Sequence, residues 1–294
     1  LGETSIGRGR VKRMHEVEAH LPVPRDAAQA PVTVDPRAQA LCDQAASING
    51  LPTTSGNRIA LMEDSDAAIE SLVADIDQAR ERVHISFYIW LDDHNGGKVA
   101  DAVSAAARRG VTCRIMVDAL GSRLFIRSPR WQQMRQAGAH LTAALDDVPR
   151  LGRMAIGRVD LRNHRKIVVI DDRIAYCGSQ NCADPAFLIK ARFAPWVDIF
   201  LRCEGPIVRQ LQYLFLVTWM TETTESVALP AAMPEARGGG DGDGVIAQMF
   251  GTGPTSRPNA MSDVFVACVM AARERLLITT PYFVPDEPIL RALC

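Results

Sequence analysis

Hydrophobic and polar positions along residues 58–144 change repeatedly between two periods, and this change predicts alternating strands and helices. The apolar positions 69, 72, 73 and 76 form one stripe of a helix that Asp64-Ser65-Asp66 caps at its start. The expected order is strand 58–62, a helix through Arg82, strand 83–90, helix 97–109, strand 111–117, helix 128–137 and strand 139–144. Such alternation indicates an α/β sandwich around a central, largely parallel or mixed sheet.

The next stretch predicts three further strands and one long helix. The β-branched run 167–170 and the run 173–177 lie on either side of two turn residues, and residues 196–201 predict another strand. Residues 206–221 predict an amphipathic helix. Its stripe of Leu, Phe and Trp is more typical of a core element than of a membrane-seeking one.

The pattern starts again near the end of the chain. Residues 272–279 (ARERLLIT) repeat residues 79–86 (ARERVHIS) at an offset of 193, and the apolar positions of the preceding helix recur at that offset. Residues 245–249 likewise echo the first strand. Agreement of strand, helix and strand in order favours a duplication over two unrelated amphipathic helices. We therefore expect a fragment that holds one complete copy and the start of a second.

Composition divides the chain at two proline-rich or glycine-rich stretches. We expect an N-terminal juxtamembrane or linker segment 1–47, a first domain 48–225, a linker 226–244 and the truncated start of a second domain 245–294.

The bulk numbers exclude some classes of protein. With 294 residues, 47% of them apolar, the chain can bury a large core. The net charge of -1 argues against a nucleic-acid groove, which needs a basic surface. The seven cysteines have no paired spacing. Four or five of them sit in apolar strand or helix patterns and are most simply buried hydrophobes in a reducing compartment, and no histidine has a metal ligand at the usual spacing.

Two basic stretches leave alternatives open. No run of eighteen apolar residues exists, but the cluster 7–13 (GRGRVKR) is typical of the cytoplasmic side of a membrane segment, and equally of a solvated terminus. The loop 145–162 carries Arg150, Arg153, Arg158 and Arg162 among apolar residues. It predicts either a surface for anionic head groups or an ordinary basic loop.

The strongest chemical signal is the stretch 163–181 (NHRKIVVIDDRIAYCGSQN). It holds His164, Lys166 and Asp171 in the spacing H-x-K-x4-D, and Gly-Ser-x-Asn follows. Side chains alternate along a strand, so His164 and Lys166 project from one face, whereas Asp171 has the opposite parity. An imidazole beside an ammonium predicts a phosphodiester site. The alternative is a buried strand with incidental surface residues, but a chain that uses Arg nearly everywhere has little reason to place a Lys here.

This motif resembles the HKD signature of the phospholipase D superfamily. The similarity to bacterial cardiolipin synthases covers about residues 48–294 and is carried by residues 83–90, 98–118, 121–123, 159–166 and 279–287. One departure is Ser86, where many members carry Glu. The resemblance implies a phospholipase D-like α-β-α sandwich with a central mixed sheet, and a second motif beyond residue 294.

The chemistry expected of the motif is exchange of a phosphodiester through a phosphohistidine. His164 is the expected nucleophile, and Lys166 with the Asn181 amide and the Ser179 hydroxyl would stabilise charge on phosphate oxygens. The resemblance implies that Asp198 holds the second imidazole nitrogen, while the residues alone leave a structural ion pair equally open. We expect Asp171 to order the motif by ion pairing. No metal or other cofactor is expected.

The resemblance also implies the substrate and the partners. It points to phosphatidyl transfer between two phosphatidylglycerol molecules, which gives cardiolipin and glycerol, at the cytoplasmic face of a bacterial inner membrane, with membrane helices upstream of residue 1. A hydrolytic phospholipase D, a nucleic-acid phosphodiesterase and a membrane-surface scaffold with a vestigial site are the alternatives. The leaving alkoxide needs a general acid, which the second motif supplies in the superfamily. We therefore expect the chain alone to be inactive unless two copies pair.

Overall fold

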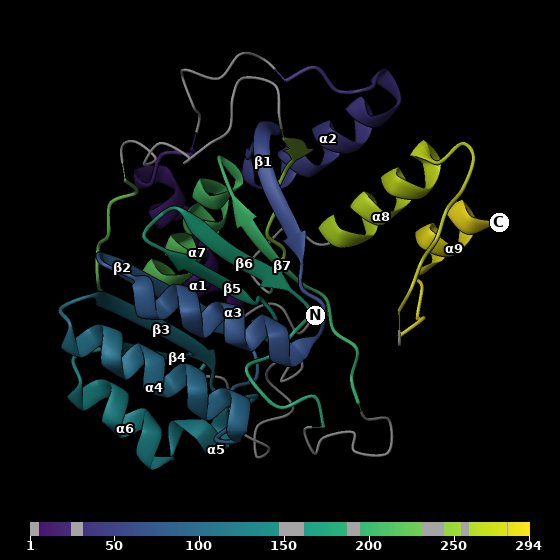
Figure 1. The fold of residues 1–294 in the computed structure, drawn as a ribbon. Helices are drawn as coiled ribbons and strands as arrows, with labels where there is room; N and C mark the ends of the chain where they lie inside the picture. The colour runs from purple at the N-terminus through teal and green to yellow at the C-terminus, as the bar shows by residue number, and fades with distance from the viewer. Residues whose placement is uncertain are drawn as a thin grey trace.

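The computed structural model describes residues 6–24, 32–146, 162–186, 195–230, 244–253, 259–280 and 282–294. An eight-stranded sheet in the order β4-β3-β2-β5-β6-β7-β1-β8 forms its centre (Figure 1). The strands are β1 Thr54–Leu61, β2 Arg82–Phe87, β3 Thr112–Asp118, β4 His140–Ala144, β5 Ile167–Ile170, β6 Ile174–Gly178, β7 Phe200–Glu204 and β8 Val245–Ala247. β2, β3 and β4 pair in parallel and the remaining neighbours are antiparallel, so the predicted α/β fold with a mixed sheet is confirmed.

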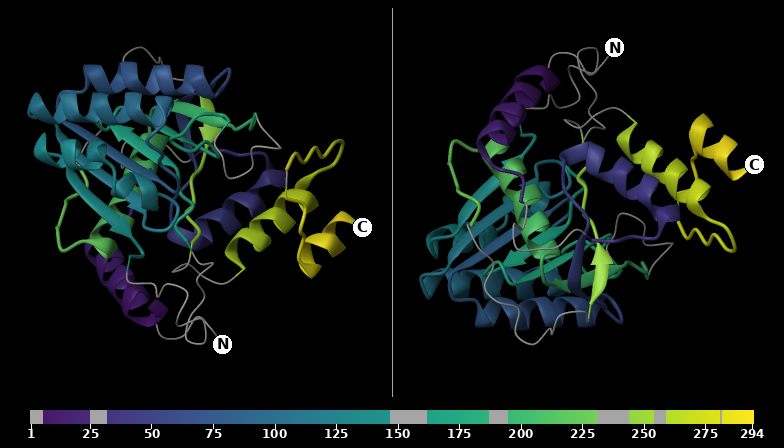
Figure 2. Two further views of the ribbon diagram at one scale, coloured as in Figure 1. Left: turned by 90° about the horizontal axis from the view of Figure 1, so that it is seen from below. Right: turned by 90° about the horizontal axis from the view of Figure 1, so that it is seen from above.

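Helices cover both faces of the sheet (Figure 2). One face carries α3 (Ser65–Gln78), α4 (His94–Arg108) and α6 (Pro129–Gln136), with the short α5 (Arg123–Ile126) beside them, and the other carries α7 (Ile207–Glu222) and then α1 (Ile6–His20). Most residues of α7 are buried because the helix lies between the sheet and α1. The prediction that this helix belongs to the core is confirmed.

Arg10 and Arg13, two arginines of the basic cluster 7–13, bind α1 to the C-terminal end of α7. Arg10 donates through Nε to the Glu222 carboxylate at 2.7 Å. Arg13 donates to the backbone carbonyls of Met220 and Thr223, so it caps the C-terminus of α7. Neither predicted role of the cluster, a membrane contact or a solvated terminus, describes these two side chains, whereas Lys12 is exposed.

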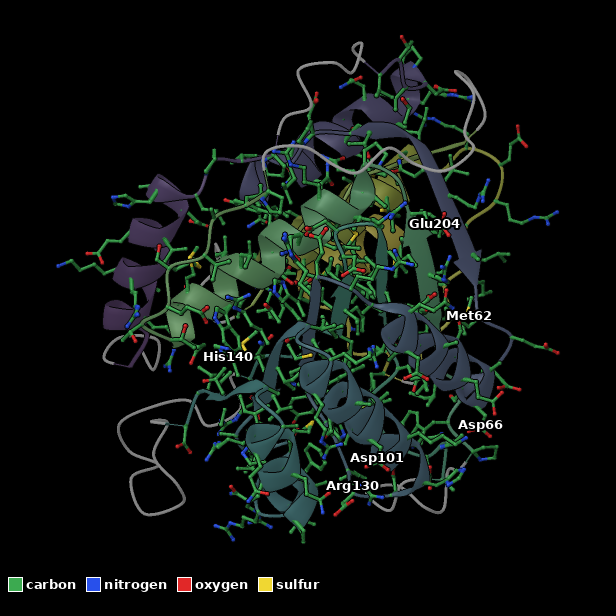
Figure 3. The ribbon with its side chains drawn as sticks, turned by 60° about the vertical axis from the view of Figure 1, so that its left-hand side comes forward. Met62, Asp66, Asp101, Arg130, His140 and Glu204 are labelled. Atoms are coloured by element: carbon green, nitrogen blue, oxygen red, sulfur yellow. The ribbon has the colours of Figure 1, made fainter. Side chains whose placement is uncertain are left out.

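The outer helix layer is joined by charged side chains. In Figure 3, Asp101 of α4 and Arg130 of α6 lie beside each other, and their closest charged atoms are 3.4 Å apart. Arg130 also donates to Asp92 at 2.8 Å. Because Asp92 follows β2 in the chain, this contact fixes the segment after β2 to α6.

Several predicted elements differ from the structure. The helix expected to run through Arg82 ends at Gln78, because Ala79 has an extended backbone. The strand expected to reach residue 90 ends at Phe87, and the strand expected over 196–201 begins only at Phe200. Residues 276–279 form no strand, and Leu277 is 81% exposed. Among the described residues no neighbouring strand supplies the hydrogen-bond ladder that this repeat would need.

The residues after the second linker partly join the first sheet. β8 pairs with β1, and Asn57 donates to the Val245 carbonyl at 3.1 Å. Gln248 donates to the Leu51 carbonyl at 2.8 Å. Beyond them α8 (Ala260–Ala271) packs on α2 (Pro36–Asn49), and α9 (Glu287–Leu293) packs on α8. The first strand of the sequence repeat therefore lies at the edge of the same sheet as the first copy.

Candidate active site

His164 and Lys166 lie together where the chain enters β5. His164 is exposed and Lys166 is half-buried. The Lys166 ammonium donates to the backbone carbonyl of His164 at 2.7 Å. The structure thus brings together the two side chains that the strand periodicity places on one face.

A third side chain, Tyr88, completes this group. Its ring stacks on the His164 imidazole with centroids 3.9 Å apart and planes 16° apart, and the Lys166 Nζ lies 5.4 Å from its centroid. The antiparallel pairing of Ser86 with Ile167 sets the residues after β2 beside those before β5, which explains this contact. In the sequence, Tyr88 stood only within residues 83–90, as part of an expected strand and of the family resemblance, and its place in the site was missed.

Asp118 is the second residue that sequence reasoning missed. It is buried at the end of β3, and its Oδ1 accepts the backbone N–H groups of Leu120 and Gly121 at 2.9 Å. Its Oδ2 accepts the N–H of Asn163 at 3.3 Å, so the start of the motif is tied to β3. The only sequence signal was its place at the end of an apolar strand in a segment that resembles cardiolipin synthases.

The environment sets the charges of the two motif residues. Partial loss of solvent around the exposed His164 lowers its pKa, the Lys166 charge lowers it further, and the Asp118 carboxylate opposes both. Burial also lowers the pKa of Lys166 to about 8, against the opposing charge of Asp198. At pH 7 the imidazole is therefore neutral while the amine is charged. A neutral imidazole can attack phosphorus, and a cation beside it can stabilise a phosphate.

Asp171 lies at the other end of β5 from this group. It and Asp172 occupy a tight turn with φ of 50° and 53°. The Asp171 carboxylate accepts the backbone N–H groups at the start of β2 with distances of 2.9, 2.8 and 2.9 Å, from Arg80, Glu81 and Arg82 respectively. The expectation that Asp171 orders the motif by ion pairing is corrected: backbone hydrogen bonds provide the order, and Asp172 makes the ion pair with Arg82.

Ser179 and Asp198 form a pair of their own. The Ser179 hydroxyl donates to Asp198 Oδ1 at 2.7 Å and accepts the N–H of Ile199 at 2.9 Å. A β-carbon at Gly178 would lie 2.0 Å from the Ile199 carbonyl oxygen, so glycine permits this close approach. Among the described contacts, Asp198 bonds to Ser179 and not to His164, and it precedes β7 rather than lying within it. The pairing that the resemblance implied for Asp198 is absent from these contacts.

Asn181 fixes the segment that carries Tyr88. Its Oδ1 accepts the N–H of Ile89 at 3.1 Å, which leaves its amide nitrogen for other contacts. Of the predicted site residues, the structure thus groups His164 with Lys166, pairs Ser179 with Asp198, places Asn181 beside the Tyr88 segment and separates Asp171 from them.

Arg165, between the two motif residues, points away from them. Its guanidinium donates to Thr218 of α7 and to the Thr252 carbonyl, the latter at 3.2 Å. With Asn163 it lines a small pocket beside α1 and α7. Arg165 therefore anchors the motif to the helical layer behind the sheet.

Over the described ranges, no three His, Cys, Asp or Glu side chains gather in a group that could hold a metal ion.

Of the basic loop 145–162, Arg150, Arg153 and Arg158 lie outside the described residues. Arg162 donates to the Leu145 carbonyl at 3.5 Å.

Comparison with known sequences places this site in a family. The family described as "Cardiolipin synthase, PLD-like domain" matches residues 72–198. Cardiolipin synthase A of Yersinia pseudotuberculosis serotype O:1b (strain IP 31758) is 38% identical over 255 residues, which are 86% of this chain and 51% of the relative. Cardiolipin synthase A of Yersinia pestis gives the same values. The chain thus spans about half the length of these curated relatives.

Solved structures show more distant similarity. NucT from Helicobacter pylori is 17% identical with a TM-score of 0.39, over 57% of this chain and 98% of NucT. Nuc from Salmonella typhimurium, a phospholipase D family member, is 15% identical with a TM-score of 0.40, over 58% of this chain and 97% of Nuc.

Proposed function

Because residues 72–198 belong to the phospholipase D-like domain family of cardiolipin synthases, we propose that the protein is a phosphatidyltransferase acting through a phosphohistidine. Its reaction is the transfer of a phosphatidyl group between two phosphatidylglycerol molecules, with release of glycerol. The observation that carries this proposal is the exposed, neutral imidazole of His164 beside the charged amine of Lys166.

The proposed reaction divides one displacement into two. A nitrogen of His164 forms a bond to phosphorus, and the bond from phosphorus to the glycerol oxygen breaks. The hydroxyl of the second phosphatidylglycerol then attacks phosphorus, loses its proton and releases the imidazole. Lys166 and the Asn181 amide stabilise the charge on the phosphate oxygens. The Ser179 hydroxyl can join them only by leaving its hydrogen bond to Asp198.

Proton transfer needs a further group. The departing glycerol oxygen must take up a proton. Of the described groups beside His164, the Tyr88 phenol has its pKa raised by burial, and the Lys166 ammonium must keep its charge to stabilise the phosphate oxygens. We propose that a second copy of the motif, from the rest of the protein or from a second chain, supplies this acid.

The proposed partners are anionic phospholipids at the cytoplasmic face of a bacterial inner membrane. The similarity to cardiolipin synthase A supports this location. Within the described ranges, no helix has both the length and the apolarity that crossing a membrane requires.

The test compares His164→Ala with the unchanged protein, both made from the whole gene. With vesicles of phosphatidylglycerol, the unchanged protein should form cardiolipin and release glycerol. It should also form an acid-labile phosphoenzyme. His164→Ala should do neither. His140→Ala is the matched control, because His140 is exposed on β4 and its ring lies 3.9 Å from the Glu225 carboxylate, away from the motif. Retained transfer in His164→Ala would exclude this nucleophile.

The products separate the alternatives. A hydrolytic phospholipase D would give phosphatidic acid without cardiolipin, and a nucleic-acid phosphodiesterase would cleave DNA or RNA and leave phosphatidylglycerol intact. A scaffold would give none of these products.

A further inference from the structure

We propose that Tyr88 is a positioning residue for this reaction: its ring holds the His164 imidazole in the orientation from which a ring nitrogen reaches phosphorus. The inference rests on the proposed function, because it assigns a role relative to the nucleophile. The hydroxyl group of Tyr88 takes no part in this role.

The stack of the Tyr88 and His164 rings leaves the nitrogens of the imidazole accessible. The two rings are nearly parallel, at 16°, with centroids 3.9 Å apart. A parallel stack covers a face of the imidazole and leaves its edge, which bears both nitrogens, open to a ligand. The ring also lies 5.4 Å from the Lys166 Nζ, so the same side chain limits the position of the cation.

Tyr88 is itself held from several sides. A β-carbon at Gly121 would lie 3.0 and 3.1 Å from two carbons of the Tyr88 ring, so the glycine backbone packs directly against the ring. The Ser122 hydroxyl donates to the Tyr88 carbonyl at 3.0 Å. Asn181 accepts the N–H of the next residue, Ile89, at 3.1 Å. A platform fixed in this way can restrict the rotamers of the imidazole that stacks on it.

The ring of Tyr88, and not its hydroxyl, contacts His164 and Lys166. Among the described residues, the Tyr88 hydroxyl forms no hydrogen bond, and burial raises the pKa of Tyr88, which keeps the phenol protonated. A phenylalanine at this position would preserve the stack and remove only the hydroxyl. A leucine would remove the stack and keep an apolar side chain.

The experiment compares Tyr88→Phe and Tyr88→Leu in the whole gene product. We expect Tyr88→Phe to keep kcat within roughly twofold. We expect Tyr88→Leu to lower kcat and the rate of phosphohistidine formation by roughly 10- to 100-fold with little change in KM, because a misoriented nucleophile costs rate rather than affinity. Equal activity of Tyr88→Leu and the unchanged protein would overturn the proposal. Equal losses in both variants would also overturn it, because the hydroxyl would then be required.

A spectroscopic measurement tests the stack without substrate. The His164 ring protons lie over the Tyr88 ring and should be shifted upfield by its ring current in the unchanged protein and in Tyr88→Phe, and not in Tyr88→Leu. An upfield shift that Tyr88→Leu removes would support the stack even if no cardiolipin is formed. Failure of the stacking proposal can therefore be distinguished from failure of the proposed function. Identical shifts in all three proteins would contradict the stack. If Tyr88→Leu does not fold, Tyr88→Met replaces it under the same criteria.

Discussion

The Lys166 ammonium is bound to the backbone carbonyl of His164, with 2.7 Å between Nζ and oxygen. This contact keeps the cation within reach of the imidazole before any substrate arrives. Because burial lowers the pKa of Lys166 to about 8, the cation is present at neutral pH and is lost in mildly alkaline solution. The two residues therefore define a limited pH range in which the imidazole is neutral and the amine is charged.

Activity should follow this range. As pH rises through the pKa of His164, which lies below the ordinary value of 6.5, the nucleophile loses its proton and kcat/KM should increase. As pH passes about 8, Lys166 loses its charge and kcat/KM should fall. The measurement is a pH profile of kcat/KM for the unchanged protein and for Lys166→Arg. In the arginine variant the alkaline limb should move to higher pH, and an unmoved limb would assign it to another group.

Replacing Lys166 should stabilise the protein while abolishing activity. The pKa of the amine is about 8 in the folded state and 10.5 in the unfolded state, so below pH 8 the folded protein carries the whole cost of holding a disfavoured charge. Lys166→Met should raise the free energy of unfolding at pH 7 by roughly 1 to 3 kcal/mol. The gain should shrink between pH 8 and 10.5, where the folded amine is already neutral.

Urea denaturation at pH 7 and pH 10 measures this effect. Lys98→Met is the matched control, because Lys98 makes an outer-layer ion pair with Glu70 at 3.7 Å and such pairs contribute little. If Lys166→Met unfolds more easily than the unchanged protein at pH 7, the hydrogen bond to His164 outweighs the cost of the buried charge.

Asp171 should matter for stability and not for the chemical step. Its carboxylate accepts three backbone N–H groups at the start of β2, on the side of β5 away from His164. Asp171→Ala leaves these donors without their charged acceptor, and the free energy of unfolding should fall by about 1 to 3 kcal/mol. The kcat of the folded protein should change by less than roughly fivefold, which corresponds to about 1 kcal/mol.

Thermal unfolding and kcat per folded molecule check this prediction together. Asp77→Ala removes an exposed carboxylate from α3 and should leave both quantities unchanged. A large loss of kcat in Asp171→Ala with unchanged stability would place this carboxylate in the chemistry after all.

Features set by local pattern were predictable from the sequence. The mixed sheet, the turn between β5 and β6 and the burial of α7 follow from apolar periodicity and turn residues. Tyr88 and Asp118 were not predictable, because their contacts depend on β2, β3 and β5 being neighbours, and neighbours in a sheet are set by long-range pairing. The same holds for residues 276–279, whose strand pattern needs a partner strand to form.

Asp198 gives a second reason why a contact in the site could not be predicted from the sequence. The resemblance implied a contact with the His164 imidazole, yet the carboxylate bonds to Ser179 in the structure. The direction of a side chain in a segment before a strand is decided by its nearest donors, here the Ser179 hydroxyl, which spacing along the sequence does not specify. Asp198 can act on the charge of Lys166 or on the His164 imidazole, and these two roles have different consequences for the pH profile.

Two variants that break the same hydrogen bond separate these roles. Ser179→Ala removes the donor and keeps the Asp198 charge, whereas Asp198→Asn removes the charge. Since that charge raises the pKa of Lys166 against the effect of burial, Asp198→Asn should move the alkaline limb of kcat/KM to lower pH, and Ser179→Ala should leave the limb where it is. Matching profiles in the two variants would mean that Asp198 acts through its bond to Ser179. Loss of phosphoenzyme in Asp198→Asn alone, at every pH, would instead make this carboxylate the partner of the imidazole.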